Sequence, residues 1–118
     1  MVRKRRQERE DTEKQKARLE QLISATDALY AEMDKLTKKG PTVQISQLSL
    51  DRVNKVIRSI KGFASEDKDE FIDEIVEFVP AGDMPEYRDV TLALSQVRAG
   101  LERFGQRRRK DWHDMGVY

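Results

Sequence analysis

The sequence predicts an all-α fold, an antiparallel bundle of three to four helices with two long, heptad-patterned members and charged terminal extensions. Two segments carry apolar or small residues at alternating spacings of three and four, which places them on one face of a helix. The two sets are Leu19, Leu22, Thr26, Leu29, Met33 and Leu36, and Tyr87, Val90, Leu94, Val97, Leu101 and Phe104. Each apolar stripe is removed from water best by the other, so we expect the two helices to pack together.

Composition supports a single charged domain. The 118 residues are enough for one modest core. Charged residues make up 38% of the chain, against about 25% in typical domains, so much of the surface should be charged helix faces. The lack of cysteine excludes disulfides, thiolate ligands and cysteine nucleophiles. No apolar run reaches the roughly 18 residues of a membrane span, and no apolar segment follows the basic start as in a secretory signal. We therefore expect a cytoplasmic protein without membrane contact.

The charge and apolar patterns divide the chain into three parts. Residues 1–18 form a basic extension, helical or frayed, because they offer almost nothing to bury. Residues 19–104 form the bundle domain, and 105–118 form a basic C-terminal tail. The first bundle helix should end at Lys38 and Lys39, where cations complement the helix dipole, before Gly40 and Pro41 stop it.

The middle of the chain predicts two shorter helices. Residues 42–48 read as a loop without a strand to pair with, and Ser49 is the expected cap of a second helix that ends near Gly62. Ser65 should cap a third helix that Pro80 ends. Its apolar residues are expected to face inward and its acidic residues to face water. The inward set is Phe71, Ile72, Ile75, Val76 and Val79.

The fourth helix should follow a capping box. Asp83 and Glu86 have the D-x-x-E spacing, and Pro85 is tolerated in the first turn. Ala93 and Gly100 lie seven residues apart beside the apolar stripe, so a neighbour can approach the backbone closely there. The apolar pattern stops at Phe104.

Short connections predict helices that alternate in direction, which brings both ends of the chain to one end of the bundle. The basic residues of the two ends then form what we call the basic pole, namely residues 3–6 and 107–110. The acidic residues of 66–77 form an acidic flank along the side.

The basic pole is the candidate nucleic-acid site. Clustered Lys and Arg neutralise phosphates and release counterions, and an adjacent Trp can stack on an unpaired base. The candidate residues are Arg3, Lys4, Arg5, Arg6, Arg107, Arg108, Arg109, Lys110 and Trp112. The alternative is a solvated tail whose arginines pair with acidic residues of the N-terminal extension.

Arg108 and His113 have the spacing R-x4-H. This spacing is similar to the catalytic motif of the HEPN ribonuclease family, and the resemblance implies RNA cleavage by these two residues. It covers two residues only, and Arg109 stands where the family usually has a polar residue. The alternative for His113 is a solvated position in a tail. The acidic run 66–77 departs from the calcium-loop pattern, so no metal and no cofactor are expected.

The function predicted from these patterns is a non-catalytic helical interaction or assembly module, an adaptor or structural subunit. Its partner is another protein or a second copy, with RNA or DNA as the alternative and no small-molecule substrate. Because the middle helices are shorter than the long pair, part of an apolar stripe is expected to stay uncovered and to mediate self-association. The candidate residues for that contact are Tyr87, Leu94, Leu101 and Phe104.

Overall fold

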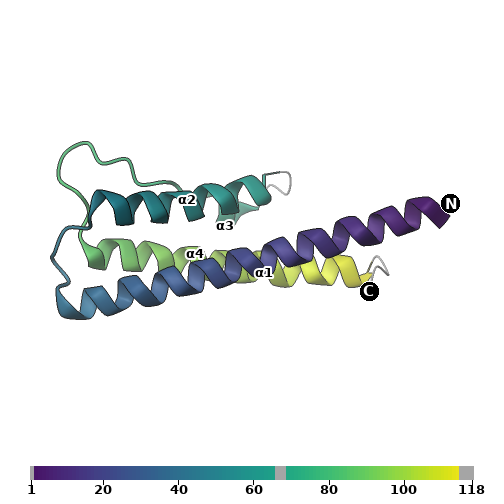
Figure 1. The fold of residues 1–118 in the computed structure, drawn as a ribbon, viewed down its shortest axis with the longest axis horizontal. Helices are drawn as coiled ribbons and strands as arrows, with labels where there is room; N and C mark the ends of the chain where they lie inside the picture. The colour runs from purple at the N-terminus through teal and green to yellow at the C-terminus, as the bar shows by residue number, and fades with distance from the viewer. Residues whose placement is uncertain (1, 66–68, 115–118) are drawn as a thin grey trace.

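The computed structural model describes residues 2–65 and 69–114, and for residues 2–5 the backbone only. Four helices account for most of these residues (Figure 1). They are α1 (Val2–Lys39), α2 (Gln47–Phe63), α3 (Glu70–Asp73) and α4 (Tyr87–Asp114). The described ranges contain no β-strand, which confirms the all-α class, and none of their helices has the length and apolar character to cross a membrane.

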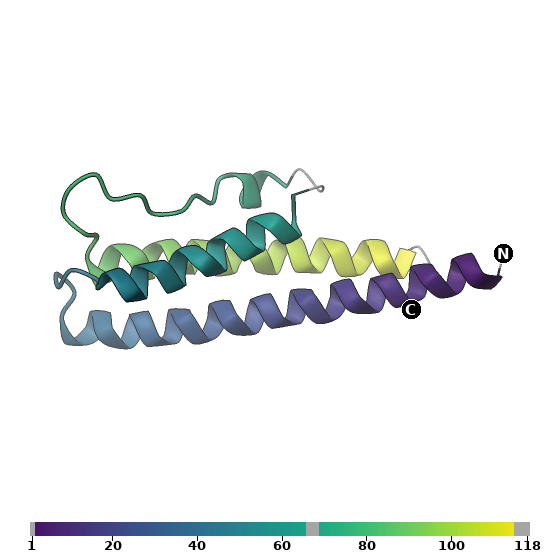
Figure 2. The same cartoon turned by 45° about the horizontal axis from the view of Figure 1, so that its top comes forward.

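The two long helices, α1 and α4, pack together and run in opposite directions (Figures 1 and 2). The Thr37 and Thr91 hydroxyls lie 2.7 Å apart at one end, and Arg108 Nη2 donates to Gln15 Oε1 at 3.3 Å near the other. Contacts therefore move backward along α1 as they move forward along α4. The start of α1 and the end of α4 lie at the same end of the molecule, as predicted, because the segment between α2 and α4 returns the chain along the molecule before α4 begins.

Both predicted apolar stripes lie in the core. Among the least exposed side chains are Leu19, Met33, Val90, Leu94, Leu101 and Phe104, each at 1% or less. Thr26 is also buried, and its hydroxyl donates to the Leu22 carbonyl at 2.7 Å, so the polar group has a partner. Helix α2 closes the core with Leu50, Val53, Ile57 and Ile60. Phe63 of α2 meets Phe104 edge to face, with 6.0 Å between ring centroids.

The helices extend past the boundaries drawn from the sequence. Helix α1 is continuous from Val2, and Thr12 within the charged extension is only 9% exposed. Helix α4 passes through Gly105 without a break and continues to Asp114. A Cβ on Gly105 would lie 3.5 Å from Leu19 Cδ2, so α1 approaches the α4 backbone closely here. Residues 105–114 of the predicted tail are therefore helical and pack on α1.

Helix α2 and its connector differ from the prediction. Ser46, not Ser49, is the N-cap: its hydroxyl accepts from the Ser49 backbone N–H at 3.2 Å. The connector also pairs with the segment that enters α4. The Ile45 N–H donates to the Pro85 carbonyl, and the Tyr87 N–H donates to the Val43 carbonyl, both at 2.9 Å. The pairing partner, which we did not predict, is a loop rather than a strand.

The largest correction concerns the third helix. A helix over 65–79 was expected, but α3 is a single turn capped by Asp69, and an extended path follows from Ile75 to the start of α4. Asn54 holds this path: its side chain accepts from the Phe78 N–H at 2.8 Å and donates to the Phe78 carbonyl at 2.9 Å. These bonds replace the ones that a helix would make. Val76 and Val79, expected to face inward, are 68% and 87% exposed.

An ion pair between α1 and α2 gives a pH prediction. Arg52 donates hydrogen bonds to both Glu32 oxygens, at 3.1 and 2.8 Å, and these bonds hold the pKa of Glu32 below 4.5. Because the folded pKa is lowered, the pair stabilises the fold above pH 4.5 and loses its effect as the pH falls through the folded pKa.

Both side chains are about half exposed, so solvent screens the pair. We therefore expect Glu32→Gln to lower the free energy of unfolding by less than about 1 kcal/mol at neutral pH. The measurement is urea denaturation of both proteins in steps from neutral pH to well below 4.5. The difference should shrink as the pH falls; a difference that grows would contradict the assignment.

Candidate functional site

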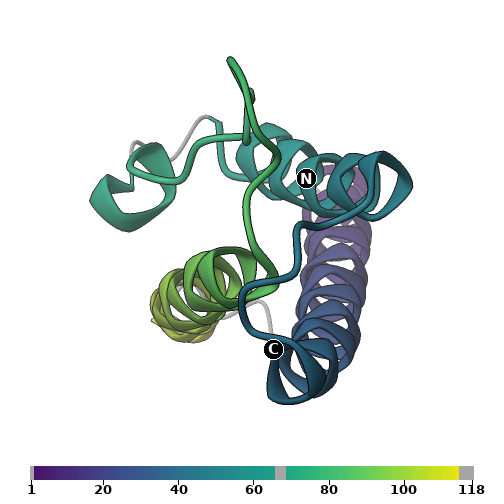
Figure 3. The ribbon, with the colours of Figure 1, turned by 90° about the vertical axis from the view of Figure 1, so that its left-hand side faces the viewer.

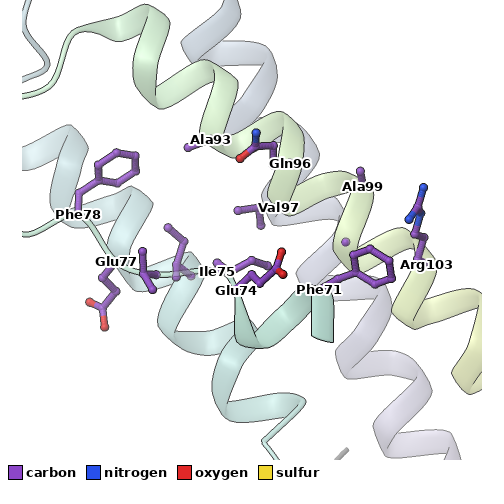
Figure 4. A pocket seen from close by; sticks show the side chains of 13 residues that line it. Phe71, Glu74, Ile75, Glu77, Phe78, Ala93, Gln96, Val97, Ala99 and Arg103 are labelled. Atoms are coloured by element: carbon purple, nitrogen blue, oxygen red, sulfur yellow. The ribbon is translucent and has the colours of Figure 1, made fainter. Parts of the chain in front are cut away.

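An apolar groove lies between α4 and the segment that contains α3. Its volume is about 530 Å³, and it is open along one side (Figure 4). In Figure 3, α1, α2 and α4 are arranged around one another, and α3 is a single turn outside them; it contacts α4 in the region where a longer helix was predicted. The lining residues are Ile57, Phe71, Glu74, Ile75, Val76, Glu77, Phe78, Ala93, Gln96, Val97, Ala99, Gly100 and Arg103.

Small residues of α4 form one wall of the groove. Ala93, Ala99 and Gly100 leave the helix backbone close to the surface of this wall. A Cβ on Gly100 would lie 3.5 Å from Phe71 Cβ and 3.8 Å from Ile75 Cδ1, so the α3 segment approaches α4 most closely there.

Apolar side chains of the α3 segment form the other wall. Ile75 is nearly buried, whereas the Phe71 ring is 44% exposed. The guanidinium carbon of Arg103 lies 4.7 Å from the centroid of that ring, a cation–π contact that fixes the ring against α4. A solvent-exposed aromatic ring beside exposed Val76 is an apolar surface that the chain itself leaves uncovered.

Asp69 fixes the α3 turn in place. One carboxylate oxygen, Oδ1, accepts from the backbone N–H groups of Phe71 and Ile72 at 2.9 and 3.2 Å. The other, Oδ2, accepts from Arg107 Nη2 of α4 at 2.5 Å. The Asp69 side chain is 2% exposed, so its charge is buried but fully partnered. The Asp69 carboxylate therefore connects the α3 wall of the groove to α4.

The rim of the groove on the α3 side is acidic. Glu77 pairs with Arg58 of α2, with 2.6 Å between Oε1 and Nη2. Glu74 also lines the groove; it is exposed, and within the described part of the chain it forms no ion pair. Glu70 and Asp73 do not line the groove, but they are exposed on the α3 turn that carries Phe71 and form no ion pair among the described residues either. The groove itself therefore has one carboxylate without a described cationic partner, and two more lie on the adjacent turn.

The predicted basic pole is only partly available for phosphates. Arg107 pairs with Asp69, and Arg108 bonds Gln15 and lies 5.8 Å from the Trp112 ring centroid. Arg109 and Lys110 are exposed on α4. Of the N-terminal set, Arg6 lies 3.8 Å from Glu10 on α1. The side chains of Arg3, Lys4 and Arg5 lie outside the described residues.

Trp112 is 3% exposed and belongs to the core. A base needs an open ring face to stack on, and this indole offers none, so the predicted stacking role does not fit this conformation. The reason is that α4 continues through the basic cluster, which the sequence reading placed in a tail.

The residues proposed for self-association are also largely internal. Leu94, Leu101 and Phe104 are 1% exposed or less within a single chain, and Tyr87 is partly buried against the same core. The α4 stripe packs in the core with α1 and α2, so Leu94, Leu101 and Phe104 are not on the monomer surface. Of the exposed large apolar side chains, Phe71 and Val76 line the groove, whereas Val43, Leu48, Val79 and Leu92 are exposed elsewhere.

The R-x4-H pair does not converge on one face. Arg108 and His113 lie on the continuous helix α4, where five residues rotate a side chain by roughly 140°. Arg108 faces Gln15 of α1, and His113 is exposed. Across the described residues, no three acidic, histidine or cysteine side chains gather as a metal site would require.

The sequence reading missed the groove, although it noted Ala93 and Gly100. The apolar spacing from Phe71 to Val79 predicts a helix that would fill this side of α4, and the contact that prevents it, from Asn54 of α2 to the Phe78 backbone, has no signal in the local sequence.

Comparison with known protein families, curated proteins and solved structures gives no match for this chain. The fold and the groove define the class of protein: a small all-α protein with one apolar groove left open beside an incomplete helix.

Proposed function

We propose that this protein is a non-catalytic helical interaction module that binds a segment of another protein in the groove between α4 and α3. The observation that carries the proposal is an open apolar groove of about 530 Å³ with the half-exposed Phe71 ring in its wall. Grooves of this kind receive the apolar face of an amphipathic helix. Bound there, such a helix would take the place that a full-length third helix would have filled in an antiparallel four-helix bundle.

Three further predictions from the sequence are retained with this proposal: partner choice by charge, a cytoplasmic location and self-association. Charge complementarity at the rim would favour the correct partner and speed its association. The absence of cysteine is compatible with a reducing cytoplasm, which we retain as the proposed compartment. Self-association is tested by the same experiment, because a second copy is one protein that the groove can capture.

The test is site-specific photocrosslinking. A photoreactive amino acid replaces Ala99 in the groove wall, and in a matched control it replaces Ala31, which is exposed on α1 away from the groove. Both proteins are irradiated in extract of the cells that produce the protein, and the adducts are identified by mass spectrometry. The proposal expects one defined protein at position 99 that is absent at 31. Identical adducts at both positions would refute it.

A second candidate function is nucleic-acid binding, which the shared end of the two basic segments favours. Arg109 and Lys110 are the exposed cations of α4 for this role. The experiment is a titration with labelled single-stranded RNA and duplex DNA at several salt concentrations, read by anisotropy. Affinity that falls steeply with salt, and a shallower salt slope for Arg109→Gln with Lys110→Gln, would support it. No binding at low salt would exclude it.

A further inference from the structure

The groove combines an apolar floor with an acidic rim, and this combination restricts what can occupy it. We infer that the occupant is an amphipathic helix of another protein, with Lys or Arg residues flanking its apolar stripe. The inference rests on the proposed function, because it names the partner class for the same groove. Three arguments support the inference: the charge of the rim, the length of the groove, and the poor fit of a second copy of this chain.

The charge of the rim selects basic residues. Glu74 lines the groove, and Glu70 and Asp73 lie on the adjacent α3 turn; all three are exposed and form no ion pair within the described part of the chain, whereas Glu77 already has Arg58. Residues 69–77 include no basic residue, and Lys61 of α2 donates to the Ile75 carbonyl rather than to a carboxylate. A helix with cations along one edge would pair with this rim, and an acidic helix would meet repulsion. On the α4 side, Gln96 is neutral and Arg103 keeps its positive charge beside Phe71, so the attraction for cations acts only along the α3 edge of the groove.

The length of the groove limits the occupant to about three helical turns. Its α4 wall extends from Ala93 to Arg103, which corresponds to roughly 15 Å at 1.5 Å per residue. Apolar side chains at positions i, i+3 or i+4, and i+7 of a partner helix would cover this length. One of them would meet the exposed Phe71 ring. Ala99 and Ala93 leave room for the partner to approach.

A second copy of this chain fits the groove poorly. In a two-fold dimer the same surface meets itself, so the acidic rims of the two grooves would face each other. Residues 6–18 of α1 carry five basic and four acidic side chains and have no apolar stripe to insert. The other apolar stripes are buried within the chain. The groove is therefore better suited to a different protein.

The test uses the whole protein and synthetic helical probes of about 14 residues, long enough to span three turns. The first probe has Leu at the i, i+3, i+4 and i+7 positions and Lys or Arg on the flanks. The second replaces every flanking cation with Glu, and the third has the composition of the first in an order that destroys the stripe. Affinities are measured by fluorescence anisotropy against the wild type and three variants: Ala99→Trp, which fills the groove; Ala31→Trp, its exposed control; and Glu70→Gln with Glu74→Gln.

We expect the first probe alone to bind in the micromolar range. Ala99→Trp should weaken binding at least about tenfold and Ala31→Trp should leave it unchanged, while the double Gln variant should weaken it and flatten its salt dependence. Equal affinity for the basic and acidic probes would overturn the inference but leave the proposed function standing. Equal affinity for the ordered and scrambled basic probes would also overturn it, since attraction to charge alone needs no groove. If no probe binds, the inference fails, and crosslinking at position 99 decides separately whether the proposed function fails too.

Discussion

Replacing Phe104 with alanine is expected to lower the free energy of unfolding by about 3–5 kcal/mol, the range measured for Phe→Ala in buried cores. Phe104 is 1% exposed and meets both α1 and the Phe63 ring of α2, so its loss leaves a cavity where three helices join. A domain of this size has a total stability of roughly 5–15 kcal/mol, so the variant should be marginal at room temperature. Urea denaturation followed by circular dichroism measures the change.

The matched control is Gln106→Ala, an exposed position two residues further along α4. It should change the free energy of unfolding by no more than about 0.5 kcal/mol. Comparing the two variants also tests whether the apolar stripe of α4 packs in the core or forms a contact between copies of the chain. If Phe104 served a contact between copies, Phe104→Ala would change the oligomeric mass while leaving the folded monomer stable. That outcome would contradict the placement of Phe104 in the core.

The sequence predicts the long helices because their signal is local and repeated. Residues from Leu19 to Leu36 and from Val90 to Phe104 keep one spacing over about five and about four turns respectively, and a pattern of that length has few alternative structures. Gly40 and Pro41 then determine where α1 ends. The antiparallel packing of α1 and α4 was also predicted, but its cause differs: the long, mostly extended segment between α2 and α4 returns the chain to the end where α2 begins, so α4 runs parallel to α2 and antiparallel to α1.

The α3 region could not be predicted in the same way, because a distant residue decides its structure. Helical spacing from Phe71 to Val79 favours a helix, but Asn54 of α2 bonds both backbone groups of Phe78. Buried backbone groups need partners, and a side chain from another element supplies them here. The apolar spacing is present, yet Phe71 and Val76 line the groove instead of the core, and Val79 is exposed. The candidate site was missed for the same reason.

The C-terminal segment was misread because the composition of residues 105–110 is that of a solvated tail. Gly105 and four consecutive basic residues suppress the apolar signal, although Arg and Lys are good helix formers. A single large side chain, Trp112, extends the core beyond them. One residue is too little for a periodicity argument, and so its burial emerged only from the structure.

Trp112→Ala is accordingly expected to lower the free energy of unfolding by about 3 kcal/mol, at the lower end for buried Trp because the last turns of a helix relax easily. The wild-type chain supplies its own probe, since Trp112 is the only tryptophan. Its emission should be blue-shifted in the folded protein, resist a soluble quencher, and move to the red on denaturation together with the loss of helical signal.

The control for Trp112→Ala is His113→Ala, at the next position, which is exposed and should change stability by no more than about 0.5 kcal/mol. An unfolded-like emission in the native protein, together with equal stability of the two variants, would show Trp112 to be part of a solvated tail. Burial would then be wrong for this residue, and a base-stacking role beside Arg109 and Lys110 would become possible again. The same spectra therefore test the core and decide how much of the basic segment can bind nucleic acid.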